Sequence, residues 1–109
     1  MKSTIAFALA LIFLGGCTSQ TSTFVVDNET DETLENAVIF QDDDATELGS
    51  IEPGQSKRLQ FRTFSENTYT LKYIRGGEEF SANLCYQGVN YPADGVVTIS
   101  ETGPSIVCK

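Results

Sequence analysis

The chain has 109 residues, no histidine and no tryptophan, and its fifteen acidic side chains outnumber seven basic ones, for a formal net charge of −8. The lack of histidine excludes Ser-His-Asp triads and metal sites built on histidine. The acidic balance disfavours nucleic acid as a partner, because phosphate binding needs clustered Lys and Arg.

The N-terminal segment has the parts of an export signal. Lys2 is followed by an uninterrupted apolar run over residues 5–14, and small residues come next. Ten residues are too few to cross a bilayer as a helix, which needs about 20 apolar residues. We therefore interpret residues 1–16 as a removed signal peptide and leave them out of the fold.

The residues that close this run, Leu14-Gly15-Gly16-Cys17, resemble the lipobox of bacterial lipoproteins. The resemblance covers residues 1–20. It implies cleavage before Cys17, a diacylglyceryl group on the Cys17 sulfur and an acyl chain on its new amino group, which together give a stable membrane anchor. Thr18, in place of Asp, implies the outer membrane, facing the periplasm. An ordinary secretory signal with an incidental cysteine is the alternative.

Removal of residues 1–16 leaves 93 residues, enough for one domain with one core. We expect residues 17–22 to be the lipidated cysteine and a short polar tether, and residues 23–109 to be the folded domain. With Cys17 lipidated, Cys85 and Cys108 remain, and an even number in an oxidising compartment predicts a disulfide. A reactive thiol is disfavoured, because no histidine is present to lower its pKa or act as its base.

From residue 23 onward apolar side chains recur with period two, in runs rich in β-branched and aromatic residues. The pattern predicts strands at 23–27, 34–41, 47–51, 57–64, 68–75, 78–86, 95–101 and 104–108. It also predicts one buried face, made of Leu59, Phe61, Tyr69, Leu71, Tyr73, Phe80, Ala82 and Leu84. Cys85 has the opposite parity to Leu84, which requires either a bulge or a disulfide on the outer face.

Turn signals separate these runs. Pro53-Gly54 is typical of a type II turn, and Gly76-Gly77 of a two-residue hairpin. Asn28-Glu29-Thr30 matches a glycosylation sequon, but we interpret it as a turn between strands. Seven or eight short strands in a chain of this size predict an all-β fold, a small antiparallel immunoglobulin-like β-sandwich.

Two groups of residues are candidates for binding. Asp42, Asp43 and Asp44, with Glu47 nearby, could offer oxygen ligands to Ca²⁺, but they lack the spacing of an EF-hand, and a solvated acidic loop is the favoured interpretation. The longest connection, 87–94, carries Asn90 and Tyr91 and follows Tyr86. These tyrosines could stack on a sugar or anchor a protein interface, or they could cap the core. We expect no metal and no cofactor.

The sequence contains no Gly-x-Ser-x-Gly elbow and no Walker phosphate loop, and we expect no enzymatic activity. The leading hypothesis is a membrane-anchored envelope lipoprotein whose sandwich binds another protein or serves a structural role. A first alternative is a periplasmic inhibitor or immunity protein against a cationic wall-degrading enzyme or toxin, steered by the acidic surface. A second is a glycan-binding module that uses Tyr86 and Tyr91.

Overall fold

The computed structural model describes residues 20–63, 66–88 and 92–109. These residues form eight β-strands and no helix. The strands are β2 (Gln20–Asn28), β3 (Leu34–Gln41), β4 (Asp44–Ile51), β5 (Ser56–Thr63), β6 (Tyr69–Arg75), β7 (Glu78–Asn83), β8 (Gly95–Ser100) and β9 (Gly103–Cys108).

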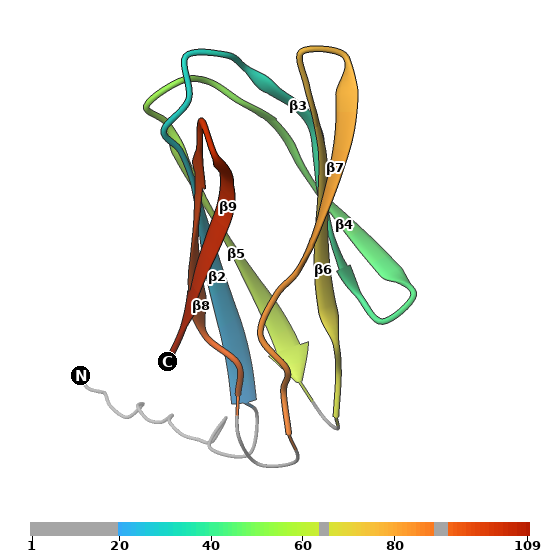
Figure 1. Cartoon of the computed structure of the whole chain (residues 1–109). Coiled ribbons are helices and arrows are strands. Elements are labelled where there is room, and N and C mark those ends of the chain that lie inside the picture. Colours follow the sequence, from blue (N-terminus) through green and yellow to red (C-terminus); the bar gives the residue numbers. More distant parts are fainter. Residues whose placement is uncertain (1–19, 64–65, 89–91) are drawn as a thin grey trace, which may run out of the picture.

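The strands make two four-stranded sheets that face each other (Figure 1). One sheet has the order β5-β2-β8-β9 and the other β4-β3-β6-β7. All strand pairs are antiparallel except one, because β2 and β8 run in parallel from Phe24↔Gly95 to Asn28↔Ile99. The predicted all-β fold is confirmed, and the two sheets have a sandwich-like arrangement. The prediction that the strands are antiparallel is wrong for the pair β2–β8.

Three strand boundaries differ by three residues from those predicted, and the other differences are of one residue. β2 begins at Gln20 rather than at residue 23, so residues 20–22 belong to the folded domain and not to a tether. Ladder pairing extends to Gln20↔Thr63, and the buried Ser22 Oγ accepts a 2.9 Å hydrogen bond from the Ala93 amide. β4 begins three residues early, at Asp44, because Asp42-Asp43 makes a two-residue hairpin turn.

β7 ends at Asn83, three residues before the predicted end. The chain then leaves the regular ladder, and Cys85 turns into the core, where it is only 5% exposed. This resolves the parity conflict without a bulge inside the strand. Cys85 and Cys108 form a disulfide with Cα atoms 5.8 Å apart, which ties the end of β7 to the end of β9 and so joins the two sheets.

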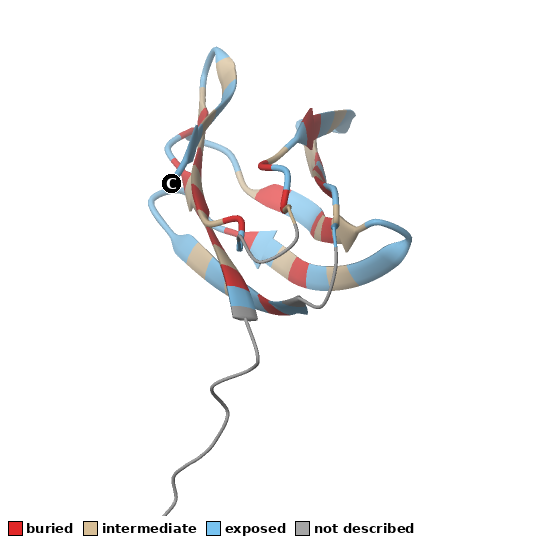
Figure 2. Cartoon of the chain, turned by 90° about the horizontal axis from the view of Figure 1, so that it is seen from below, coloured by how far each residue is buried: buried red, intermediate tan, exposed pale blue. Residues whose placement is uncertain are grey.

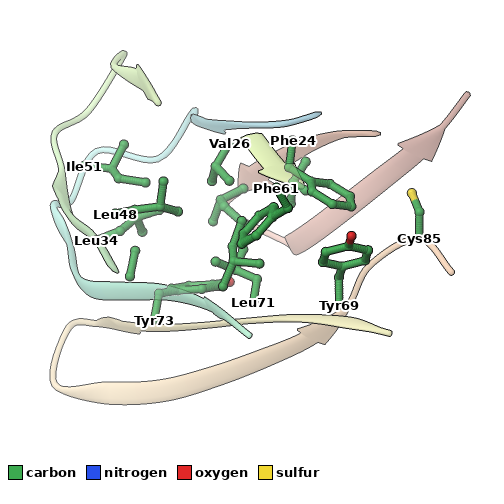
Figure 3. Packing of buried hydrophobic residues seen from close by; sticks show 14 of the residues in the cluster. Phe24, Val26, Leu34, Leu48, Ile51, Phe61, Tyr69, Leu71, Tyr73 and Cys85 are labelled. Carbon is green, nitrogen blue, oxygen red and sulfur yellow. The ribbon is translucent and has the colours of Figure 1, made fainter. Parts of the chain in front are cut away.

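The core lies between the sheets, and its buried residues recur along the strands (Figure 2). They alternate with less buried residues most regularly along β2, β6 and β8. At its centre the rings of Phe24, Phe61 and Tyr69 pack against one another, with centroids 4.8–6.3 Å apart (Figure 3). Of the predicted face, five residues are buried and Leu59, Phe80 and Leu84 pack partly exposed at its margin.

The two ends of the sandwich differ in their connections. We call one the Asn28 end; it holds the turns 29–33, 52–55, 76–77 and 101–102. Asn28 is 1% exposed and satisfies all its amide hydrogen bonds: Nδ2 donates to the carbonyls of Glu32 and Ile51, and Oδ1 accepts from the Thr30 amide and hydroxyl, all at 2.8–2.9 Å. Because Asn28 is buried and all its amide groups are hydrogen-bonded, its role is structural. This agrees with the interpretation of Asn28-Glu29-Thr30 as part of a turn rather than as a glycosylation site.

Candidate binding surface on the outer face of one sheet

The outer face of the β4-β3-β6-β7 sheet carries apolar side chains that the core does not use. Ile39 and Leu71 are buried partners across β3 and β6, so their neighbours Phe40, Val38 and Lys72 point outward. Val38, Phe40 and Ile74 are half-buried there, and the Lys72 ammonium lies 5.2 Å from the centroid of the Phe40 ring. Outward positions of an antiparallel sheet are usually polar, so this apolar group surrounding a cation is a candidate interface.

An open groove of about 500 Å³ runs over this face and is lined by Asn36, Lys72, Tyr73, Ile74, Glu79, Phe80 and Ser81. Its rim depends on an irregularity in β3. The register of β3 against β6 shifts between Glu35 and Val38, and Asn36 takes a left-handed conformation with φ of 51°. Asn tolerates this conformation better than most residues, and bulges of this kind re-aim side chains at functional sites.

A second groove of about 360 Å³ lies further along β6 and β7, lined by Thr68, Tyr69, Thr70, Asn83, Leu84, Cys85 and Tyr86. Tyr86 is 60% exposed, and its hydroxyl donates a 2.6 Å hydrogen bond to Glu66 Oε1. That bond, with desolvation and the nearby charges of Glu66 and Asp42, raises the pKa of Tyr86 above its ordinary value. Hydroxyl, amide and aromatic groups therefore meet at this groove.

A polar network behind Tyr86 fixes the backbone that carries it. Gln87 is 1% exposed, and its Oε1 accepts hydrogen bonds from the Tyr69 hydroxyl at 3.0 Å and from Asn67 Nδ2 at 2.9 Å. Gln41 Nε2 in turn donates to the Tyr69 hydroxyl at 3.1 Å. Because these groups bridge β3, β6 and the segment after β7, Tyr86 is held on a rigid base.

The acidic residues singled out in the sequence have separate roles. Asp42 has φ of 52° in the hairpin turn, and its Oδ1 accepts hydrogen bonds from the Thr68 amide at 3.0 Å and hydroxyl at 3.1 Å. Asp43 completes the turn, and Asp44 opens β4. Within the part of the chain that the structure describes, no group of three or more His, Cys, Asp or Glu could hold a metal ion. Asn90 and Tyr91 lie outside the described residues.

A family match now places the chain among known proteins. A domain of unknown function, DUF8725, matches residues 17–101. The chain belongs to the DUF8725 family. The "NMR structure of the protein from Eubacterium rectale" is similar in fold, with a TM-score of 0.55 and 14% identity over 81% of this chain and 87% of that one. No curated protein matches the sequence.

The DUF8725 match includes every residue that lines the two grooves, whereas Cys108 lies beyond it. Sequence reasoning found Tyr86 but missed Asn36, Phe40, Lys72 and Ile74. A signal for three of them was present, since Lys72 and Ile74 have the opposite parity to the buried residues of β6, and Phe40 to the buried Ala37 and Ile39 of β3. The conformation of Asn36 left no comparable signal in the sequence.

The other sheet of this DUF8725 domain has a smaller outer groove of about 200 Å³, lined by Thr23, Val25, Arg58, Asp94, Gly95, Val96 and Lys109. Val96 pairs with Val107, which is 60% exposed on the edge strand β9. Among the described residues, no helix has the length and hydrophobicity that a bilayer crossing requires.

Proposed function

We propose that this chain is a lipid-anchored, non-enzymatic binding protein of the bacterial envelope, held by Cys17 at the periplasmic face of the outer membrane. Its partner is a protein that docks on the outer face of the β4-β3-β6-β7 sheet. The observation that carries the proposal is the placement of Val38, Phe40 and Ile74 on an outward face beside a groove of about 500 Å³. An apolar centre with a polar rim is the usual anatomy of a protein interface.

We also propose that the fold is of immunoglobulin-like type. The strands β2 to β7 follow the chain order B, C, C′, E, F, G of such domains, and the sheet β4-β3-β6-β7 then corresponds to C′-C-F-G. The departure is in the other sheet, where β8, parallel to β2, stands where a strand A antiparallel to β2 would lie. A solved structure in which β4, β3, β6 and β7 do not form a sheet in this order would contradict the assignment.

The docking face is tested by photocrosslinking in the producing bacterium. A benzophenone side chain replaces Ser81 at the groove, and a matched control replaces Gln60, which is exposed on the outer face of the other sheet. We expect one defined protein to be captured from position 81 and not from position 60. Capture must also be lost in the double variant Lys72→Ala, Ile74→Ser. Equal capture from both positions, or capture that survives the double variant, would refute this docking face.

The anchor is tested separately by mass spectrometry of the N-terminal peptide. Cys17 should carry acyl groups, and Cys17→Ser should release the domain from the membrane fraction into the soluble one. An unmodified Cys17 would refute the proposed anchor. It would not affect the test of the docking face, which depends only on the crosslinking at position 81.

Glycan binding is a second candidate, because the Tyr86 groove is lined by the neutral hydroxyl and amide groups of Thr68, Thr70 and Asn83. Such groups match sugar hydroxyls, and an exposed ring offers a stacking face. The domain should then be retained on purified peptidoglycan and lose retention with Tyr86→Ala. Unchanged retention in that variant would remove this candidate.

Inhibition of a cationic wall-degrading enzyme or toxin is a third candidate, favoured by the carboxylates at the Asn28 end. Exposed acids there are Glu29, Asp31, Glu32, Glu52, Glu78 and Glu101. Such a surface speeds association with a basic partner and does so less in high salt. Inhibition of muramidases by the purified domain, lost at high ionic strength, would favour it. Full activity of a muramidase panel would count against it.

A further inference from the structure

The position of the chain's entry into the fold sets the orientation of the domain on a membrane. β2 starts with the pair Gln20↔Thr63, and Thr63 is followed four residues later by Asn67, which bridges to Gln87 beside Tyr86. The start of β2, the 42–43 hairpin turn, Glu66 and the segment 84–88 therefore share one end of the sandwich, which we call the Tyr86 end. Figure 1 shows that β2 and β6 both begin at this end, at the bottom of the view.

The spacing between anchor and fold is short. Only Thr18 and Ser19 separate Cys17 from Gln20, and three residue steps span at most about 11 Å. We propose that the Tyr86 end faces the bilayer and that Tyr86 contacts its headgroup layer. This inference rests on the proposed lipid anchor at Cys17.

Tyr86 has the properties of an interfacial residue. Its ring is 60% exposed while its hydroxyl is bound to Glu66, so an apolar body and a polar tip are presented together. Tyrosine is enriched at membrane–water interfaces for this combination. The network of Tyr69, Gln87 and Asn67 holds the adjacent backbone in place, so contact with lipid orders little further chain.

The charge of the same end selects the kind of lipid. Asp42, Asp43, Asp44 and Glu66 are exposed there and outnumber the exposed cations, which are Arg62, opposite Thr21, and Lys109, next to Cys108. An anionic leaflet would repel these carboxylates within a Debye length of about 8 Å. The surface fits a headgroup layer of zwitterionic phospholipid. The Asn28 end, eight or nine residues along β2, then points away from the membrane by roughly 26 Å.

The experiment uses the full chain produced with its own N-terminal segment in a bacterium. A benzophenone side chain replaces Tyr86, and a matched control replaces Glu29, which is exposed at the Asn28 end. After irradiation, mass spectrometry reads two peptides: the N-terminal one for acylation of Cys17 and the labelled one for lipid adducts. Acylated Cys17 with phospholipid adducts at position 86 and not at 29 is the expected result.

The two peptides test the orientation of the domain and the lipid anchor at Cys17 separately. An unacylated Cys17 refutes the anchor. An acylated Cys17 with adducts at position 29, or with adducts at neither position, refutes the orientation while the anchor stands.

The lipid preference is tested by reconstituting the purified lipoprotein into vesicles. Adduct yield at position 86 should be about fivefold lower in vesicles rich in anionic lipid than in zwitterionic vesicles at low salt. The variant Asp43→Asn, Asp44→Asn should reduce that difference. A yield that is equal in both vesicles, or higher in anionic ones, would overturn the charge argument.

Discussion

A β-carbon placed on Gly95 would lie 2.8 Å from the Cys85 sulfur and 3.3 Å from two ring carbons of Phe24. The disulfide and the aromatic core thus meet at the first residue of β8, where only glycine leaves room. The backbone of Gly95 needs no left-handed conformation, so the constraint is one of space.

Gly95→Ala should therefore destabilise the domain by about 1–3 kcal/mol, the usual cost of overpacking a core. Urea unfolding of the oxidised protein measures this change. The same substitution in a Cys85→Ala, Cys108→Ser background should cost less, because the sulfur it meets is gone. An equal cost in both backgrounds would show that the strain lies elsewhere.

Removal of the disulfide by Cys85→Ala, Cys108→Ser should cost about 3 kcal/mol, since the bridge closes a segment with a sequence separation of 23. The expected readout is a lower urea midpoint with the β-sheet circular dichroism spectrum retained. A midpoint unchanged from that of the oxidised protein would mean that the two sheets stay joined at this end without the bridge.

Asn28→Ala should cost at least about 3 kcal/mol, because it leaves the carbonyls of Glu32 and Ile51 and the polar groups of Thr30 without their amide partner. Asn28→Asp keeps the oxygen acceptor but places a carboxylate against the carbonyls of Glu32 and Ile51. Its loss of unfolding free energy should therefore become smaller at acidic pH, where that carboxylate is protonated. The exposed Asn83→Ala is the matched control and should change the unfolding free energy by less than about 0.5 kcal/mol.

The ion pairs at the Asn28 end predict a pH dependence. Arg75 Nε lies 2.8 Å from Glu32 Oε1, and Arg75 also pairs with Glu101. The hydrogen bond from Arg75 holds the pKa of Glu101 below its ordinary value. A lowered folded pKa gives stability that is present above about pH 4.3, the ordinary glutamate value, and is lost as pH falls through the folded pKa.

Glu101→Gln should accordingly lower the urea midpoint at pH 7, and the gap from the unaltered protein should close in acid. Glu47→Gln is the control, an exposed carboxylate of β4 that forms no ion pair within the described residues. A gap for Glu101→Gln that is the same at both pH values would contradict the electrostatic explanation.

The Tyr86–Glu66 hydrogen bond predicts an alkaline titration. Glu66 raises the pKa of Tyr86, so Glu66→Gln should move that pKa down towards about 10. Because the folded pKa is raised, the bond stabilises the fold below about pH 10 and this contribution is lost as pH rises through the folded value. Nuclear magnetic resonance of the Tyr86 ring carbon attached to oxygen follows the titration directly. An upward move would refute the assigned cause.

Much of this fold follows from local patterns in the sequence. Period-two alternation predicted eight strands, because most of them bury one face, and Gly76-Gly77 marked a hairpin whose glycines both have positive φ. Of the three boundaries that were wrong by three residues, the start of β4 is set by the local Asp42-Asp43 turn, and the other two are set by partners far along the chain. Ser22 is held in β2 by its hydrogen bond from Ala93, and Cys85 leaves the ladder with its sulfur buried and bonded to Cys108 on β9.

The candidate surface shows the same division. Tyr86 was singled out because an aromatic residue beside a long connection is a local signal. The grouping of Phe40, Lys72 and Ile74 depends on the register of β3 against β6, which the sequence does not state. Opposite parity marks a side chain as outward-facing, but only the pairing of strands shows which outward side chains are neighbours.

The parallel pair β2–β8 has a consequence for how the molecule acquires its structure. β2 is an inner strand, and contacts such as the hydrogen bond from the Thr23 amide to Asp94 join positions 71 apart. Closing so long a loop is slow, and no shorter segment supplies the missing neighbour. A growing or threading chain therefore leaves one side of β2 unpaired until about residue 99 has emerged, and the domain reaches its native state in a late, cooperative step.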